Sequence, residues 1–143
     1  MPKRILVPLK GTSASEAVLP IVAHATSGVG ATLRLLHVAP VPHNLVSASG
    51  RVIAYADQVM GRVDAEWLSY LGRVAATLHD TATECIVRFG DPAREIVAEA
   101  EAWGAELIAM TDRPGRVWWR RFRRVAEAVS RKVRIPILLY RAR

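Results

Sequence analysis

The sequence predicts an α/β domain with a single open, five-stranded parallel sheet and helices on both faces, as in Rossmann-like folds. Three observations lead to this prediction. Short apolar segments alternate with segments of helical periodicity along nearly the whole chain, which favours parallel strands joined by right-handed helical crossovers. The length of 143 residues suits one domain, residues 1–143. Hydrophobic residues make up 51% and charged residues 23% of the chain, a globular composition.

The first strand and the first helix are predicted close to the N-terminus. Arg4–Leu9 is a compact apolar run followed by a polar loop. Ser13 and Glu16 have the spacing of a capping box, so a helix is expected from there, ending at a Ser-Gly pair. Pro20 falls inside this predicted helix, where it would remove one backbone hydrogen bond. The predicted inward face of the helix consists of Val18, Ile21, Val22 and Ala25.

The middle of the chain is predicted to form the second strand, a loop and the longest helix. Thr32–Val38 is apolar, and residues 41–50 have a loop-like composition. The helix shows apolar spacings of three and four at Met60, Val63, Trp67, Leu71, Val74 and Leu78. Trp67 and Leu71 are interpreted as core residues, with an aromatic platform for a ligand as the weaker alternative. His37 is interpreted as structural rather than catalytic, since no acid or cysteine lies close to it in the sequence.

Three further strands are predicted in the second half of the chain. Thr83–Arg88 is the third strand, and Asp91 can cap the helix that follows it. Leu107–Thr111 is the fourth strand. The fifth strand is Ile135–Tyr140, and it should begin near Pro136 or lie at a sheet edge because proline cannot donate to a ladder of hydrogen bonds.

Positive charge is concentrated in one part of the chain. The net charge is +7, and Lys10 with the six arginines between Arg113 and Arg124 equals that excess. Such a concentration favours phosphate-bearing partners, whether a nucleotide, a nucleic acid or an anionic membrane surface. No apolar run reaches the roughly 18 residues of a membrane span, and the N-terminus lacks a signal-peptide pattern. A soluble, cytoplasmic protein is therefore expected.

An anion site is predicted where the fourth strand passes through a loop into an arginine-rich helix. In open α/β sheets, loops at the carboxyl ends of strands direct backbone N–H groups at bound anions. Side chains of Lys10, Arg113 and Arg116 would add cationic contacts to a phosphate or similar group. The candidate ligand-contacting residues are Leu9, Lys10, Gly11, Val38, Thr111, Arg113, Gly115, Arg116, Arg123 and Arg124.

Several stretches of the chain, in their order and spacing, match a known family. They are the first strand with Pro8, Gly11–Thr12, Ser13–Glu16, Leu35–Val38, Gly90–Ile96, Ala105–Met110, Val125–Val129 and Ile135–Leu138. Together they resemble universal stress protein domains over essentially the full chain. The resemblance implies a five-stranded parallel sheet of the adenine-nucleotide alpha hydrolase-like type and a role in stress adaptation or regulation. It also implies a homodimer through the last strand, which agrees with the apolar character of Ile137–Tyr140 at an expected sheet edge.

The chain departs from the pattern of the family's ATP-binding members. Those members carry Gly-x-x-Gly, nine residues, then Gly and Ser or Thr after the fourth strand. The corresponding positions here are Met110, Arg113, Arg123 and Arg124. Only Gly115 is a nearby loop glycine, and a family aspartate after the first strand is replaced by Lys10. Long side chains would obstruct the approach of phosphates to backbone amides, so no cofactor is required, and ATP or AMP would depend on Arg and Lys side chains.

The arginine-rich helix from Val117 has two further interpretations. As an amphipathic helix it has an inward stripe of Trp118, Phe122, Val125 and Val129. Its opposite face then carries Arg116, Arg120, Arg123, Arg124 and Arg131. That face is either a solvated surface or, with Trp119 at its margin, a binding surface for nucleic acid or acidic lipid.

No catalytic constellation is recognisable in the sequence. There is no close Ser/His/Asp set, no cluster of metal ligands, no H-E-x-x-H helix and no phosphate loop with lysine. The four histidines are scattered at His24, His37, His43 and His79. The sequence therefore predicts a regulatory binding domain without enzymatic activity, catalytic residues or a metal.

Overall fold

The computed structural model describes the backbone of residues 2–112 and 117–141, and the side chains of residues 2–44, 47–52, 55–111 and 125–141. Its main feature is a five-stranded sheet of order β5-β2-β1-β6-β7 in which all pairs are parallel. The strands are β1 (Arg4–Pro8), β2 (Thr32–Ala39), β5 (Ala82–Phe89), β6 (Leu107–Asp112) and β7 (Ile137–Arg141). The helices are α1 (Leu19–Thr26), α2 (Ala56–Ala76), α3 (Pro92–Trp103) and α4 (Val117–Lys132). The predicted α/β fold is confirmed.

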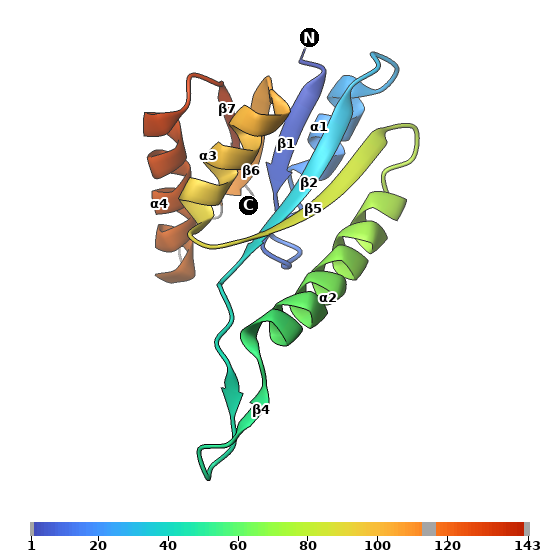
Figure 1. The fold of residues 1–143 in the computed structure, drawn as a ribbon. Helices are drawn as coiled ribbons and strands as arrows, with labels where there is room; N and C mark the ends of the chain where they lie inside the picture. Colours follow the sequence, from blue (N-terminus) through green and yellow to red (C-terminus); the bar gives the residue numbers. More distant parts are fainter. Residues whose placement is uncertain (1, 113–116, 142–143) are drawn as a thin grey trace.

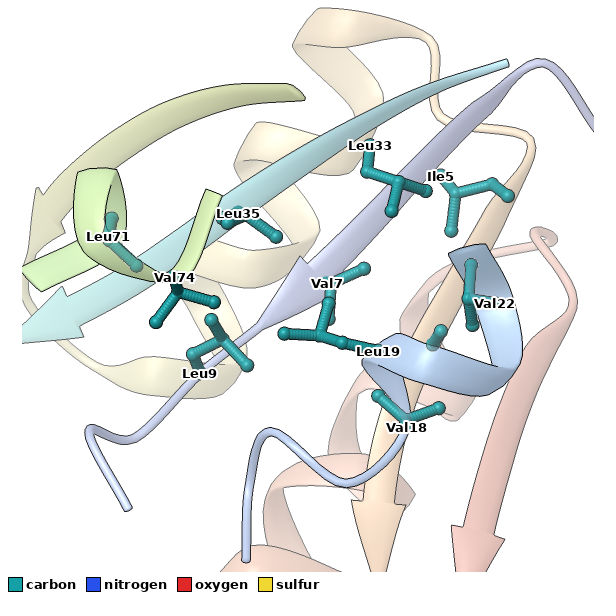
Figure 2. Packing of buried hydrophobic residues seen from close by; sticks show 11 residues of the cluster. Ile5, Val7, Leu9, Val18, Leu19, Val22, Leu33, Leu35, Leu71 and Val74 are labelled. Carbon is teal, nitrogen blue, oxygen red and sulfur yellow. The ribbon is translucent and has the colours of Figure 1, made fainter. Parts of the chain in front are cut away.

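Helices α1 and α2 cover one face of the sheet, and α3 and α4 cover the other (Figure 1). Successive side chains of a strand point to opposite faces, so β1 contributes to both cores. Ile5, Val7 and Leu9 pack with residues of α1 and α2 (Figure 2), whereas Leu6 packs in the core under α3 and α4. Because both faces are covered, the central strands are apolar at most positions, which explains their compact apolar runs in the sequence.

The segment between β1 and α1 differs from the prediction. Residues 12–18 form successive turns, and α1 begins only at Leu19. The predicted capping box is not formed, since the carboxylate of Glu16 accepts a hydrogen bond from the Tyr70 hydroxyl at 2.6 Å. Pro20 therefore lies in the first turn of α1, where a backbone N–H has no helical partner to lose. The expectation that Pro20 removes a backbone hydrogen bond from the helix is wrong.

The predicted inward face of the first helix is correct only in part. Val18 and Val22 are buried, but Ile21 is 41% exposed and Ala25 is also exposed. The late start makes α1 only eight residues long. Ile21 and Ala25 line a shallow depression of about 90 Å³ that Leu138 of β7 also lines.

A short hairpin lies within and just after the loop predicted for residues 41–50. Strands β3 (Leu45–Val46) and β4 (Val52–Ala54) pair in antiparallel fashion. The hairpin stands away from the five-stranded sheet and leads directly into α2 (Figure 1). Strands this short leave no readable periodicity, which is why the sequence did not reveal them.

Several predicted boundaries are confirmed. The Asp91 carboxylate accepts a hydrogen bond from the Arg94 N–H at 3.0 Å and caps α3. Gly104 ends α3 in the left-handed conformation, with φ of 76°. Strand β7 begins directly after Pro136 and lies at the sheet edge.

Within the described ranges, no helix is long and apolar enough to cross a lipid bilayer.

Candidate functional site

A small cavity lies at the carboxyl ends of β1 and β2, where open α/β sheets bind ligands. Its lining residues are Pro8, Leu9, Lys10, Leu36, His37, Val38, Pro92, Ile96 and Val125. The cavity volume is about 50 Å³, well below the roughly 300 Å³ at which pockets for drug-sized ligands begin. As shaped here, the cavity has room for a small group of a ligand but not for a whole nucleotide.

Leu9, Lys10 and Val38, three of the predicted site residues, line this cavity together. The Leu9 N–H donates to the Leu36 carbonyl at 2.8 Å, which extends the sheet bonding one residue beyond β1. The Lys10 N–H donates to the Ser15 hydroxyl at 3.1 Å. Gly11 follows with φ of 84°, a conformation that glycine adopts without steric cost. Of the residues predicted in the loop after β1, Leu9 and Lys10 line the cavity, whereas Gly11 is not among the lining residues.

Thr111, another predicted site residue, has a different role. Its hydroxyl donates to the Ser15 carbonyl at 3.1 Å and accepts the Val18 N–H at 3.1 Å. The side chain is buried. Thr111 therefore ties the end of β6 to the turns before α1, and it is not among the residues that line the cavity.

The remaining predicted residues cannot be compared with the cavity. Arg113, Gly115 and Arg116 lie outside the described residues. Arg123 and Arg124 belong to α4, but their side chains lie outside the described set. The same helix does contribute Val125 to the cavity lining. Met110, which the sequence pattern aligns with the first loop glycine of the ATP-binding members, lies within β6 and is fully buried in the core under α3 and α4.

His37 lies at the end of β2 and contributes to the cavity wall. Its Nδ1 lies 2.8 Å from the Leu9 carbonyl oxygen, so Nδ1–H donates to that oxygen. Burial lowers the pKa of His37, and the hydrogen bond to Leu9 opposes this shift in part. The ring is therefore neutral at pH 7.

Trp67 of α2 covers the loop after β1 instead of packing in the main core. Its indole stacks on the His37 ring with a centroid distance of 3.4 Å and an interplanar angle of 18°. A Cβ added to Gly11 would lie 2.7 Å from Trp67 Cη2, so only glycine fits under the ring. The interpretation of Trp67 as a core residue is wrong, whereas Leu71 is fully buried as predicted.

Tyr70, one turn further along α2, supports this arrangement. Its ring meets the Trp67 ring edge to face, with a centroid distance of 5.5 Å and an angle of 90°. Burial, followed by the hydrogen bond to Glu16, raises the pKa of Tyr70 well above its usual value. The sequence analysis interpreted His37 as structural, and the signal that it could line the cavity was its place at a strand end.

Other charged groups near the sheet are engaged in ion pairs. Arg34 pairs with Glu84 and Glu99, and Arg88 pairs with Glu95 and Glu99, at N–O distances of 2.9–3.7 Å. Among the residues that the structure describes, no group of three His, Cys, Asp or Glu side chains is arranged to hold a metal ion. Among the described residues that line the cavity, Lys10 is the cationic one.

Comparisons with known proteins agree with this fold. The sequence model of the Universal stress protein family matches residues 1–141. Curated protein sequences give no significant match. The fold is similar to that of the hypothetical protein MJ0577, with a TM-score of 0.76 and 22% identity over 99% of this chain and 96% of that chain.

Two similar structures contain nucleotides. One is a universal stress protein in complex with cAMP, with a TM-score of 0.66 and 14% identity over 99% of this chain and 98% of that chain. The other is a universal stress protein family protein from Arabidopsis thaliana with AMP bound, with a TM-score of 0.62 and 14% identity over 99% of this chain and 93% of that chain. At such identities the similarity shows the fold alone.

Proposed function

The chain belongs to the universal stress protein family, and from that premise we propose that it is a regulatory domain for stress adaptation that binds an anionic small molecule and catalyses no reaction. The observation that carries this proposal is the cavity at the carboxyl ends of β1 and β2, which Lys10 lines. Loops at these strand ends are where open α/β sheets bind ligands, and an ammonium group favours a phosphate there.

The ligand class that suits this site best is a nucleotide with a single phosphate group, of which only a small part would enter the cavity of about 50 Å³. The relatives in complex with cAMP and with AMP provide the first ligands to test. A triphosphate needs several donors around its phosphates, as glycine-rich loops provide them. Among the described residues that line the cavity, Lys10 is the cationic one, and Met110, which the sequence pattern aligns with a family loop glycine, is buried within β6. ATP should therefore bind more weakly than AMP or cAMP.

Calorimetric titration with AMP, cAMP, ATP and inorganic phosphate tests the proposal. AMP or cAMP should bind, and Lys10→Glu should abolish the binding because it reverses the charge at the cavity. Lys132→Glu is the matched control, since it makes the same charge change at the exposed end of α4. Equal losses in the two variants, or no binding of any of the four ligands to the unaltered protein, would contradict the proposal.

A second candidate function is the binding of nucleic acid along α4. Glu127 is the one acidic residue in the sequence of α4, and Arg131, Lys132 and Arg134 are exposed at its end. At 3.6 residues per turn, positions 120, 124 and 131 of the helix lie opposite the buried Val129. A basic face of this kind favours binding to a phosphate backbone without reading its sequence.

DNA retention measured at several salt concentrations separates the two candidates. If α4 binds nucleic acid, affinity should fall steeply with salt, and Arg120→Glu or Arg131→Glu should weaken binding to any sequence alike. Arg113→Glu should then have little effect on DNA. Retention that depends on Lys10 or Arg113 instead would favour the small-ligand site, and retention by acidic vesicles alone would point to a membrane surface.

We further propose that the protein forms a homodimer through β7. This strand is an edge of the sheet, and Leu138 and Leu139 are 39% and 41% exposed on its two faces. An apolar edge strand is prone to pair with a second copy. Light scattering should return twice the monomer mass of 15.7 kDa, and Leu138→Glu with Leu139→Glu should return the monomer mass. A monomer at micromolar concentration of the unaltered protein would contradict this proposal.

A further inference from the structure

We propose that Trp67 and His37 are positioning residues for the ligand cavity, because their stacked rings fix the backbone that carries Lys10. The inference rests on the proposed ligand site, and it links His37, which lines the cavity, to Trp67, which does not. Lys10 belongs to the cavity under α3 and α4, whereas Trp67 belongs to α2 on the opposite face (Figure 1). In the described chain, Trp67 is not among the residues that line the cavity.

The backbone on both sides of Lys10 is held by named contacts. Before it, Leu9 donates to Leu36 and accepts from His37 Nδ1, both at 2.8 Å. At Lys10 itself, the N–H donates to the Ser15 hydroxyl at 3.1 Å. Lys10 therefore has a fixed backbone although it lies in an irregular segment between β1 and α1.

After Lys10, the backbone is constrained by the packing of Trp67 against Gly11. The Trp67 ring lies so close to Gly11 that an added Cβ would be 2.7 Å from Cη2 and 2.8 Å from Cζ3. The same indole also contacts the His37 ring, stacked at a centroid distance of 3.4 Å. Trp67 thus packs against Gly11, which follows Lys10. It also orients His37, which donates to the carbonyl of Leu9, the residue before Lys10.

The position of Trp67 is itself fixed by α2. Tyr70 meets its ring edge to face and bonds to Glu16 in the turns before α1, at 2.6 Å. Leu71 in the next turn is fully buried in the core with Leu9 (Figure 2). Because α2 is anchored at these points, it acts as a rigid support for the loop. A lysine whose backbone is held in place before binding loses less conformational freedom when the ligand arrives, which raises affinity.

Two substitutions at Trp67 separate the ring contact from simple filling of space. Trp67→Phe keeps a flat ring for stacking on His37, and Trp67→Leu keeps apolar volume without a ring. If the loop of Trp67→Leu is competent for only a tenth of the time, its affinity for AMP should fall about tenfold. Trp67→Phe should retain most of the affinity. The matched control is Trp103→Leu, which removes an indole that packs on Arg34 at 4.4 Å, away from the cavity lining.

Amide hydrogen exchange gives a measurement that needs no ligand. The N–H groups of Leu9 and Lys10 are both hydrogen-bonded, so they should exchange about tenfold faster in Trp67→Leu than in Trp103→Leu at equal global stability. Unchanged exchange at these two amides would overturn the inference, whatever the ligand results. If the unaltered protein binds no phosphate ligand, the proposed function fails, while the exchange rates still decide whether Trp67 positions Lys10.

A third variant covers the case in which Trp67→Leu does not fold. Gly11→Ala places a Cβ in steric conflict with the Trp67 indole and leaves the indole in place. It should accelerate exchange at Leu9 and Lys10 and weaken AMP binding, as Trp67→Leu does. Normal exchange and normal affinity in Gly11→Ala would overturn the inference.

Discussion

His37 is a buried base, and its environment makes stability depend on pH. Burial lowers the pKa of His37 below the ordinary value of 6.5, so the unfolded chain binds this proton more readily than the folded chain. The free energy of unfolding is therefore highest above about pH 6.5 and falls as the pH drops from there towards the lowered pKa. Urea denaturation between pH 8 and pH 5 should record this fall.

Replacement of His37 tests the assignment of that pH dependence. His37→Gln removes the titrating group, so the fall in unfolding free energy below about pH 6.5 should become smaller. The same substitution at the exposed His24 is the control. An equal effect of the two substitutions on the pH profile would mean that His37 is not the group responsible.

Gly11 combines a special backbone conformation with a close neighbour. Gly11→Ala should cost about 2 kcal/mol or more, because it adds the strain of a positive φ of 84° to a Cβ clash with Trp67. Gly28 has a similar φ of 78° with nothing within 4 Å of an added Cβ, so Gly28→Ala should cost only about 1 kcal/mol. Chemical denaturation measures both values. Equal losses would mean that the indole does not constrain Gly11.

Between elements, Glu99 of α3 joins β2 and β5 through two arginines. Its side chain is 4% exposed and lies 3.5 Å from Arg34 and 3.7 Å from Arg88. Glu99→Ala would leave both guanidinium groups without this buried partner, and it should cost about 3 kcal/mol of unfolding free energy. Glu84 pairs with the same Arg34 but is 46% exposed, so Glu84→Ala should cost less than about 1 kcal/mol. Similar losses of unfolding free energy in the two variants, measured by denaturant titration, would show that the burial of Glu99 does not strengthen its ion pairs.

The start of α1 shows where a local sequence signal fails. The Ser13–Glu16 spacing predicted a helix start, but Glu16 binds Tyr70 of α2, a residue distant in sequence. A capping box needs the same carboxylate, so the tertiary partner prevails and α1 starts later. By contrast, Asp91 has the local Arg94 N–H as its partner, and the predicted cap is present. Local signals were reliable where their partners were local.

For the whole molecule, the succession of sheet strands and helices along the chain could be predicted from the sequence, because a sheet covered on both faces requires apolar strands. Pro136 likewise indicated the edge strand, since proline cannot donate to a ladder. The choice of the loop after β1 as a candidate ligand site rested on the general rule for ligand sites in open sheets. The stack of Trp67 on His37 could not be predicted, because it depends on how α2 crosses the ends of β1 and β2.

Amide chemical-shift mapping with AMP tests most directly whether the carboxyl ends of β1 and β2 hold the ligand. The largest shifts should appear at Leu9–Gly11 and His37–Val38, and at Val125 of α4, because these residues line or adjoin the cavity. Lys10→Glu should abolish the shifts, and Lys132→Glu should leave them in place. Shifts confined to the exposed residues Arg131, Lys132 and Arg134, or no shifts at millimolar AMP, would contradict a ligand site at the strand ends.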